Sequence, residues 1–182
     1  MKHMKFLGLL ILTAFCSGNT FAQTKMVGGA AMYPSKNIVE NAVNSKDHTT
    51  LVAAVKAAGL IPTLEGKGPF TVFAPTNEAF DALPAGTVET LLKPENKAKL
   101  TSILTYHVVP GKISSGDLMK MIKDHNGKAM LKTVESENLY FTMDGQNLMV
   151  TDEMGGTAKI TIADVNQSNG VIHVINKVLL PK

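Results

Sequence analysis

The hydrophobic pattern of the chain changes near its middle, and this change restricts the folds open to it. Between residues 37 and 104, apolar side chains recur mostly at the spacing of amphipathic helices, interrupted by a run of β-forming residues at Phe70–Ala74. After Lys128 the pattern is mostly that of strands, and Leu139–Met143 and Asn147–Val150 flank an Asp-Gly pair that is typical of a hairpin. Helices followed by strands predict an α+β fold with the helices gathered on one side of a sheet.

Composition narrows the class of protein further. The chain has 182 residues, of which 45% are hydrophobic and 18% charged, and these values are typical of one folded domain. All of its basic residues are lysines. Because bidentate reading of phosphate and guanine depends on arginine, we expect no nucleic-acid partner.

The N-terminus has the layout of a secretory signal peptide. Lys2 and Lys5 precede the apolar run Phe6–Phe15, and Thr20–Ala22 offers small residues before a cleavage point. A membrane-spanning helix needs about 20 apolar residues, and this run has half that length. We therefore predict that residues 1–22 are a signal peptide and that the protein is exported, to the periplasm, the cell surface or the medium.

Cleavage there would remove Cys16, the one cysteine of the chain. The mature protein would then be free of disulfides, and burial alone would stabilise it. Lipidation of Cys16 is an alternative, although the bulky Phe15 before it disfavours that cut. We interpret residues 23–36 as an N-terminal arm and 37–181 as a single domain, with no transmembrane segment in the mature chain.

Three segments carry a family resemblance: TVFAPTNEAF at Thr71–Phe80, YHVVPG at Tyr106–Gly111 and NGVIHVINKVLLP at Asn169–Pro181. In this order they resemble the conserved motifs of the fasciclin (FAS1) domain, and the resemblance covers nearly the whole mature chain. It implies a wedge-shaped β-sheet, helices packed against it mostly from the N-terminal half, and the first and last motif strands side by side.

The same segments contain residues to which we assign structural roles. Thr76 is placed to cap a short helix, and Asn77 to bond free backbone N–H groups or a neighbouring loop. The helix that follows Lys46 is expected to take its own cap from Asp47 or Thr49. In the last motif, His173 lies within an apolar strand that we expect to be central, and Asn176 stands where the family usually has aspartate.

The resemblance implies a secreted or surface-held adhesion or matrix module. Its partner would be a surface or matrix protein, a polysaccharide, or a second copy of the chain. In animal members, integrin binding has been tied to positions that correspond here to Tyr106, His107, Asp164 and Val165. For Tyr106 and His107 we weigh a structural alternative, because His107 follows Leu104 at helical spacing and would turn into the core, held by a backbone carbonyl. The chain has no RGD tripeptide.

Other functions find less support. No hydrolase elbow, zinc-protease motif or phosphate loop is present, so we expect neither an enzyme nor a cofactor. The acid pair Asp152-Glu153 reads as a solvated loop. The histidines share no metal-ligand spacing, and we predict no metal site. Two alternatives stay open: a small apolar ligand held between sheet and helices, and copper(I) held by methionine thioethers. Core packing is the competing explanation for the following methionines: Met119, Met121, Met130, Met143 and Met149.

Overall fold

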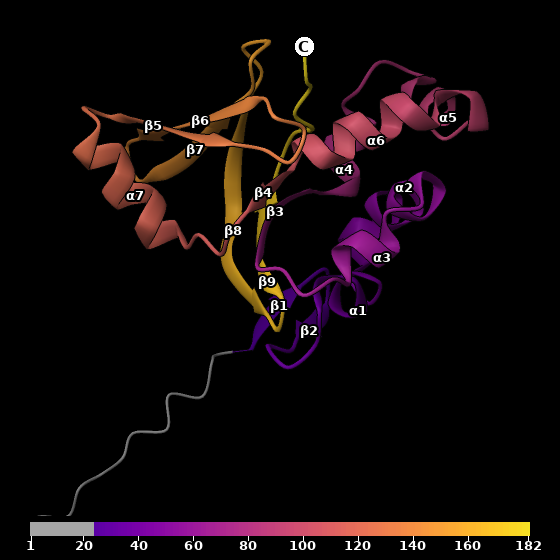
Figure 1. The fold of residues 1–182 in the computed structure, drawn as a ribbon, viewed down its shortest axis with the longest axis horizontal. Coiled ribbons are helices and arrows are strands. Elements are labelled where there is room, and N and C mark those ends of the chain that lie inside the picture. The colour runs from indigo at the N-terminus through magenta and orange to yellow at the C-terminus, as the bar shows by residue number, and fades with distance from the viewer. Residues whose placement is uncertain (1–23) are drawn as a thin grey trace, which may run out of the picture.

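A seven-stranded sheet organises the computed structural model, which describes residues 24–182 (Figure 1). The strands lie in the order β4-β3-β9-β8-β7-β6-β5. Their bounds are β3 Phe70–Pro75, β4 Val108–Pro110, β5 Lys128–Lys132, β6 Asn138–Asp144, β7 Asn147–Thr151, β8 Thr157–Gln167 and β9 Gly170–Ile175. A separate antiparallel pair consists of β1 (Lys25–Val27) and β2 (Ala30–Met32).

The helices lie mostly in the N-terminal half, as the sequence predicts. Their bounds are α1 Ile38–Ala42, α2 Thr49–Ala58, α3 Ile61–Leu64, α4 Asn77–Asp81, α5 Thr87–Leu91, α6 Lys97–Tyr106 and α7 Ser115–Asp124. Figure 1 shows the first six on one side of the β3-β9-β8 region and α7 on the other side, beside the hairpin strands β5–β7. The α+β class is therefore confirmed. None of the helices in the described part of the chain is long and apolar enough to cross a membrane.

The first and last motif strands are direct neighbours. β3 pairs with β9 in parallel, with Phe73 opposite His173. β9 lies between β3 and β8, and all of its residues are buried. This arrangement confirms the expected central strand and joins two segments that lie about a hundred residues apart in the sequence.

The sheet bends along β8, where the register with β9 shifts twice between Ile160 and Val165. Such irregularities increase the twist of a strand and let a sheet fold over itself into a wedge. Successive side chains of a strand point to opposite faces. Val72 and Ala74 therefore enter one core, and Phe73 between them enters another.

We call these two clusters the helical core and the hairpin core. The helical core lies under α1–α6 and includes Leu51, Val55, Leu64, Leu104, Ile172 and Val174. The hairpin core lies under β5–β8 and α7 and includes Tyr106, Leu118, Leu139, Phe141, Ile160 and Ile175.

The segment interpreted as an N-terminal arm packs on the helical core. Val27 of β1 and Met32 of β2 are buried there. Asn41 of α1 supports the hairpin by donating to the carbonyl of Tyr33 (2.8 Å) and accepting from the Tyr33 N–H (3.0 Å). The predicted signal peptide, residues 1–22, lies outside the described residues.

Asp152 is buried, so the expectation that it lies in a solvated loop is wrong. Its carboxylate accepts hydrogen bonds from the N–H groups of Met154 (3.0 Å), Gly156 (2.6 Å) and Leu180 (3.0 Å). These bonds shape the turn between β7 and β8 and fasten the C-terminal segment to it. A buried carboxylate is tolerated here because backbone donors satisfy it.

Candidate functional site

Tyr106 ends helix α6 and is wholly buried. Its hydroxyl donates to the carbonyl of Asn138 (2.9 Å) and accepts from the N–H of Glu153 (3.1 Å). Burial raises the pKa of this phenol to about 12. The side chain thus ties α6 to the start of β6 and to the turn after β7.

His107 follows as the C-cap of α6 and is also buried. Its Nδ1 lies 2.8 Å from the carbonyl oxygen of Ile103, and its Nε2 lies 3.0 Å from the N–H of Leu179. Nδ1 must therefore donate and Nε2 accept, which defines one neutral tautomer. Burial lowers the pKa of His107 to about 4. This geometry matches the structural alternative that the helical spacing suggests.

Asp164 and Val165 lie at the irregular part of β8. Asp164 has a positive φ of 56°, and its carboxylate accepts from both the N–H (2.7 Å) and the hydroxyl of Ser115. Desolvation raises the pKa of Asp164, but the hydrogen bonds from Ser115 and the charges of His173 and Lys25 outweigh it, so the pKa lies below its usual value. Val165 is buried, so only Asp164 of this pair reaches the surface.

A surface depression is lined by Ala163 and Ser115, the chain neighbour and the hydrogen-bond partner of Asp164. We call it the methionine depression; it is lined by Ser115, Met119, Met143, Gln146, Asn147, Leu148, Lys159, Ile160, Thr161 and Ala163. Met119 and Met143 are 45% and 38% exposed, so core packing is wrong as an explanation for both; Met130 on β5 is exposed as well. On α7, Leu118 and Ile122 occupy the buried face, which turns the adjacent Met119 away from the core.

The predicted motif residues connect neighbouring elements. Thr76 caps α4 by accepting from the N–H of Ala79. Asn77 reaches across to α2, where its Oδ1 accepts from the N–H of Thr50 (3.0 Å) and its Nδ2 donates to the carbonyl of Lys46 (2.8 Å). The expected cap of α2 by Asp47 or Thr49 is wrong, because His48 is the N-cap residue and Asn77 supplies the missing acceptor.

The last motif is held in the same way. His173 accepts from the N–H of Asp164 at Nδ1 (3.2 Å) and donates to the carbonyl of Ile113 at Nε2 (2.9 Å). Burial lowers the pKa of His173. Asn176 accepts from the N–H of Lys159 through Oδ1 (2.7 Å). A carboxylate could accept that bond too, so asparagine keeps the contact without the charge.

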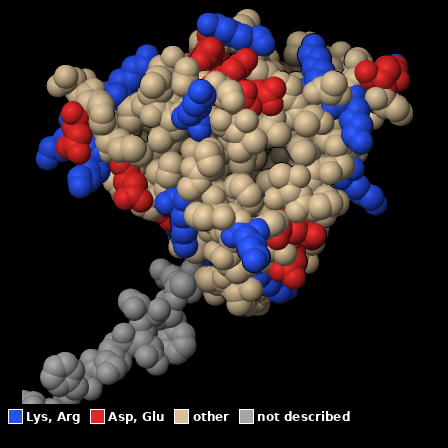
Figure 2. All heavy atoms as spheres, in the orientation of Figure 1, with Lys and Arg blue, Asp and Glu red and all other residues tan. Residues whose placement is uncertain are grey.

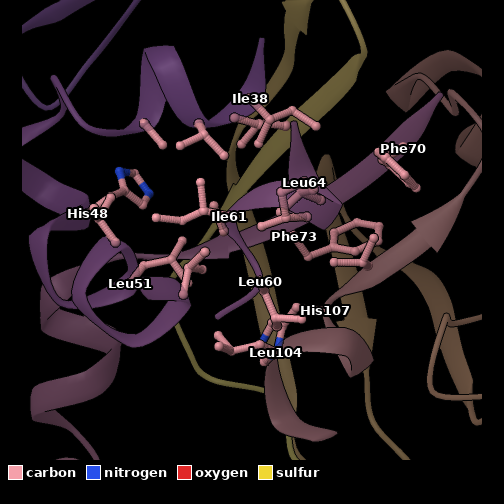
Figure 3. Close-up of a pocket in the computed structure, with 18 of the residues that line it drawn as sticks. Ile38, His48, Leu51, Leu60, Ile61, Leu64, Phe70, Phe73, Leu104 and His107 are labelled. Atoms are coloured by element: carbon pink, nitrogen blue, oxygen red, sulfur yellow. The ribbon is translucent and has the colours of Figure 1, made fainter. Parts of the chain in front are cut away.

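A second hollow, which we call the helix–sheet cavity, lies inside the helical core (Figure 3). It has a volume of about 400 Å³ and a lining that is almost entirely apolar, from α1, α2, α3, β3 and β9. Four lining residues, Val43, Lys56, Thr63 and Val134, are exposed, so the cavity opens to solvent. Figure 2 shows a hollow in a broad face of uncharged residues. The sequence gives no direct signal for such a space, because it depends on packing between distant segments.

Metal-ligating groups do not converge in the described part of the chain, where no three His, Cys, Asp or Glu side chains form a possible site. His107 and His173 are each engaged at both ring nitrogens, and the Nδ1 of His125 is bonded to the carbonyl of Met121. Copper(I) binding by methionine thioethers stays an open alternative.

The fold and the buried motif residues define a small α+β domain built on one bent sheet. The sequence pattern of the fasciclin domain matches residues 46–181. The chain belongs to the fasciclin family.

Relatives include both bacterial and animal proteins. The chain is 46% identical over 168 residues to protein sll1483 of Synechocystis, covering 92% of this chain and 86% of that protein. It is 35% identical over 145 residues to immunogenic protein MPB70 of Mycobacterium bovis, covering 77% of this chain and 66% of that protein. It is 40% identical over 131 residues to transforming growth factor-beta-induced protein ig-h3 of Sus scrofa, covering 72% of this chain but 17% of that much longer protein.

A solved structure shares the fold. It is a FAS1 domain pair from the insect cell adhesion molecule fasciclin I, with a TM-score of 0.72 and 17% sequence identity. The match covers 80% of this chain and 51% of that one. At this identity, the comparison establishes the architecture.

Proposed function

We propose that the protein is an exported binding module that contacts a protein or polysaccharide of the cell surface or matrix. Membership of a family that includes a cell adhesion molecule carries this proposal. The layout of the N-terminus supports export. Binding rests on surface complementarity, and the protein breaks and forms no covalent bonds.

The methionine depression is the surface best suited to the partner. It combines two exposed thioether side chains with the amide groups of Gln146 and Asn147 and the ammonium group of Lys159. Methionine adapts to irregular partners, and exposed apolar groups rimmed by polar ones are typical of interaction sites. Asp164 borders this surface in a fixed orientation because Ser115 holds its carboxylate.

In the described structure, a partner does not have access to all four of the family positions. Tyr106, His107 and Val165 are at most 3% exposed, and only Asp164 is within reach of a partner. Their assignment as contact residues stays a prediction. In this structure the buried three support the strands and the helix from which the surface is built.

Capture from envelope extracts and a glycan array test the proposal. The variant Met143→Lys places a charge in the depression, and we expect it to lose most of the material that the wild type captures. Met154→Lys is the matched control, because Met154 is 66% exposed and lies outside the depression. Equal capture by both variants would refute the assigned surface. Failure of the wild type to bind, together with turnover of a chromogenic ester or glycoside, would favour an enzyme instead.

A further inference from the structure

The helix–sheet cavity contains a polar atom without a partner in the described chain. His48 is 3% exposed and lines the cavity. Its Nδ1 is bonded to the hydroxyl of Ser45 (2.8 Å), whereas its Nε2 is buried and makes no hydrogen bond. Buried polar groups are nearly always satisfied, so an orphan of this kind calls for a ligand or a bound water.

Burial is the largest influence on this imidazole and lowers the pKa of His48. The carbonyl of Ala74 and the charge of Asp47 offset part of the effect. That carbonyl is near the ring but makes no hydrogen bond of normal geometry with it. His48 is therefore a neutral group at physiological pH, with one nitrogen available to the cavity.

Helix α2 forms one wall of the cavity. His48, Leu51, Val52, Val55 and Lys56 all line it, and their spacing places them on one face over two helical turns. At 1.5 Å per residue this face is about 12 Å long. One end holds the buried His48, and the other ends at the exposed Lys56. In Figure 3, His48 lies on one side of the cavity and Phe70 and Phe73 lie on the other, with Ile61 and Leu64 between them.

Water is a poor occupant for this space. A buried water usually makes about three hydrogen bonds, and apolar cavities without such partners stay dry. His107, the other lining histidine, uses both nitrogens elsewhere. The volume of about 400 Å³ falls within the range of small-molecule sites, which are mostly apolar with few polar groups.

We propose that the helix–sheet cavity binds one elongated, uncharged apolar molecule whose hydroxyl group hydrogen-bonds to Nε2 of His48. A charged head group would be costly at that buried end, because Lys56, the charged residue of the lining, lies at the opposite, exposed end of the α2 face. A hydroxyl suits either neutral tautomer of His48, because it can both donate and accept. The inference is independent of the proposed surface function, since the cavity and the methionine depression share no residue.

Fluorescence titration with N-phenyl-1-naphthylamine tests whether the cavity accepts apolar molecules. Val52→Phe fills the space from α2, and we expect it to weaken binding of this probe by about tenfold or more. Ala53→Phe is the matched control, because Ala53 lies next to Val52 on α2 but is exposed and outside the lining. We expect the wild type and Ala53→Phe to bind the probe equally well. No binding by the wild type, or equal binding by both variants, would overturn the proposal.

Displacement of the same probe by 1-octanol and by octane tests the polar contact. In His48→Phe we expect the affinity for 1-octanol to fall about fivefold, the size of one lost hydrogen bond, with no fall for octane. An equal change for both competitors would remove His48 from the proposal. Methyl NMR spectra of the wild type with 1-octanol check the site without any variant: shifts should centre on Leu51, Val55 and Leu64. Shifts centred outside the lining would contradict the assignment.

Discussion

Asn169 shows how a single side chain can join distant parts of this domain. Its Oδ1 accepts from the N–H of Ile38 (3.0 Å), and its Nδ2 donates to the carbonyls of Leu64 (2.7 Å) and Gly66 (3.0 Å). The side chain is buried, and its bonds to Ile38 and Leu64 satisfy buried backbone groups. In the sequence, Asn169-Gly170 reads as a turn signal, and nothing there reveals partners more than a hundred residues away.

We predict that Asn169→Ala lowers the free energy of unfolding by about 2–3 kcal/mol, because it leaves buried backbone groups unsatisfied. Urea denaturation measures the change. Asn44→Ala is the control: Asn44 is exposed and bonds only to Glu40 in its own helical segment, so its effect should stay within about 0.5 kcal/mol. Equal losses for the two variants would contradict the assigned role of Asn169.

His107 makes stability depend on pH. Its pKa is about 4 in the folded protein and near 6.5 when unfolded, so the unfolded chain binds an additional proton between these values. The contribution of neutral His107 to the free energy of unfolding is therefore fully present above about pH 7. It falls by about 3 kcal/mol as the pH drops from 6.5 to 4. His48 and His173, whose pKa values are also lowered, add to the fall.

Urea denaturation at pH 7.5 and pH 4.5 measures this dependence. His107→Gln keeps a donor and an acceptor for the Ile103 carbonyl and the Leu179 N–H but does not titrate. We expect the pH dependence of this variant to be smaller than that of the wild type. A dependence of unchanged size would show that His107 is not a neutral core residue.

At the scale of elements, sequence patterning predicts regular structure well and its edges poorly. The strand at β3 and the hairpin of β6 and β7 are both confirmed. The turn of that hairpin is displaced by one residue: Asp144 still pairs with Asn147, and Gly145 begins the turn with a φ of 58°. Glycine is suited to this backbone conformation, which explains why the turn centres one residue later than the Asp-Gly signal implies.

Helix α2 illustrates why capping is hard to predict. Its N-cap residue His48 makes no capping bond, and the acceptor for Thr50 comes from Asn77, 27 residues further along. Local sequence identifies the cap candidates Asp47 and Thr49, but only the packing of α4 against α2 brings Asn77 to this end.

We predict that Asn77→Ala lowers stability by about 1–2 kcal/mol, because α2 loses its cap and Lys46 loses a hydrogen bond. Thermal unfolding followed by circular dichroism measures the change. Lys123→Ala, at an exposed position on α7, should leave Tm nearly unchanged. Identical melting temperatures for the two variants would remove the structural role of Asn77.

Across the domain, one bent sheet separates two cores that differ in how completely they are packed. The hairpin core is closed by aromatic packing such as Phe73 against Phe141, with ring centroids 5.3 Å apart. The helical core contains the helix–sheet cavity. Composition predicts that burial must stabilise the domain. It does not predict where packing is incomplete, because that depends on how the six helices α1–α6 pack against β3 and β9.

Both cores depend on the parallel pairing of β3 and β9, which places the first and last motif strands side by side between β4 and β8. Cross-strand nuclear Overhauser contacts test this pairing most directly. We expect backbone contacts around Phe73 and His173, together with slow amide exchange in both strands. Absence of these contacts, or contacts that pair β3 with a different strand in place of β9, would contradict the parallel pairing.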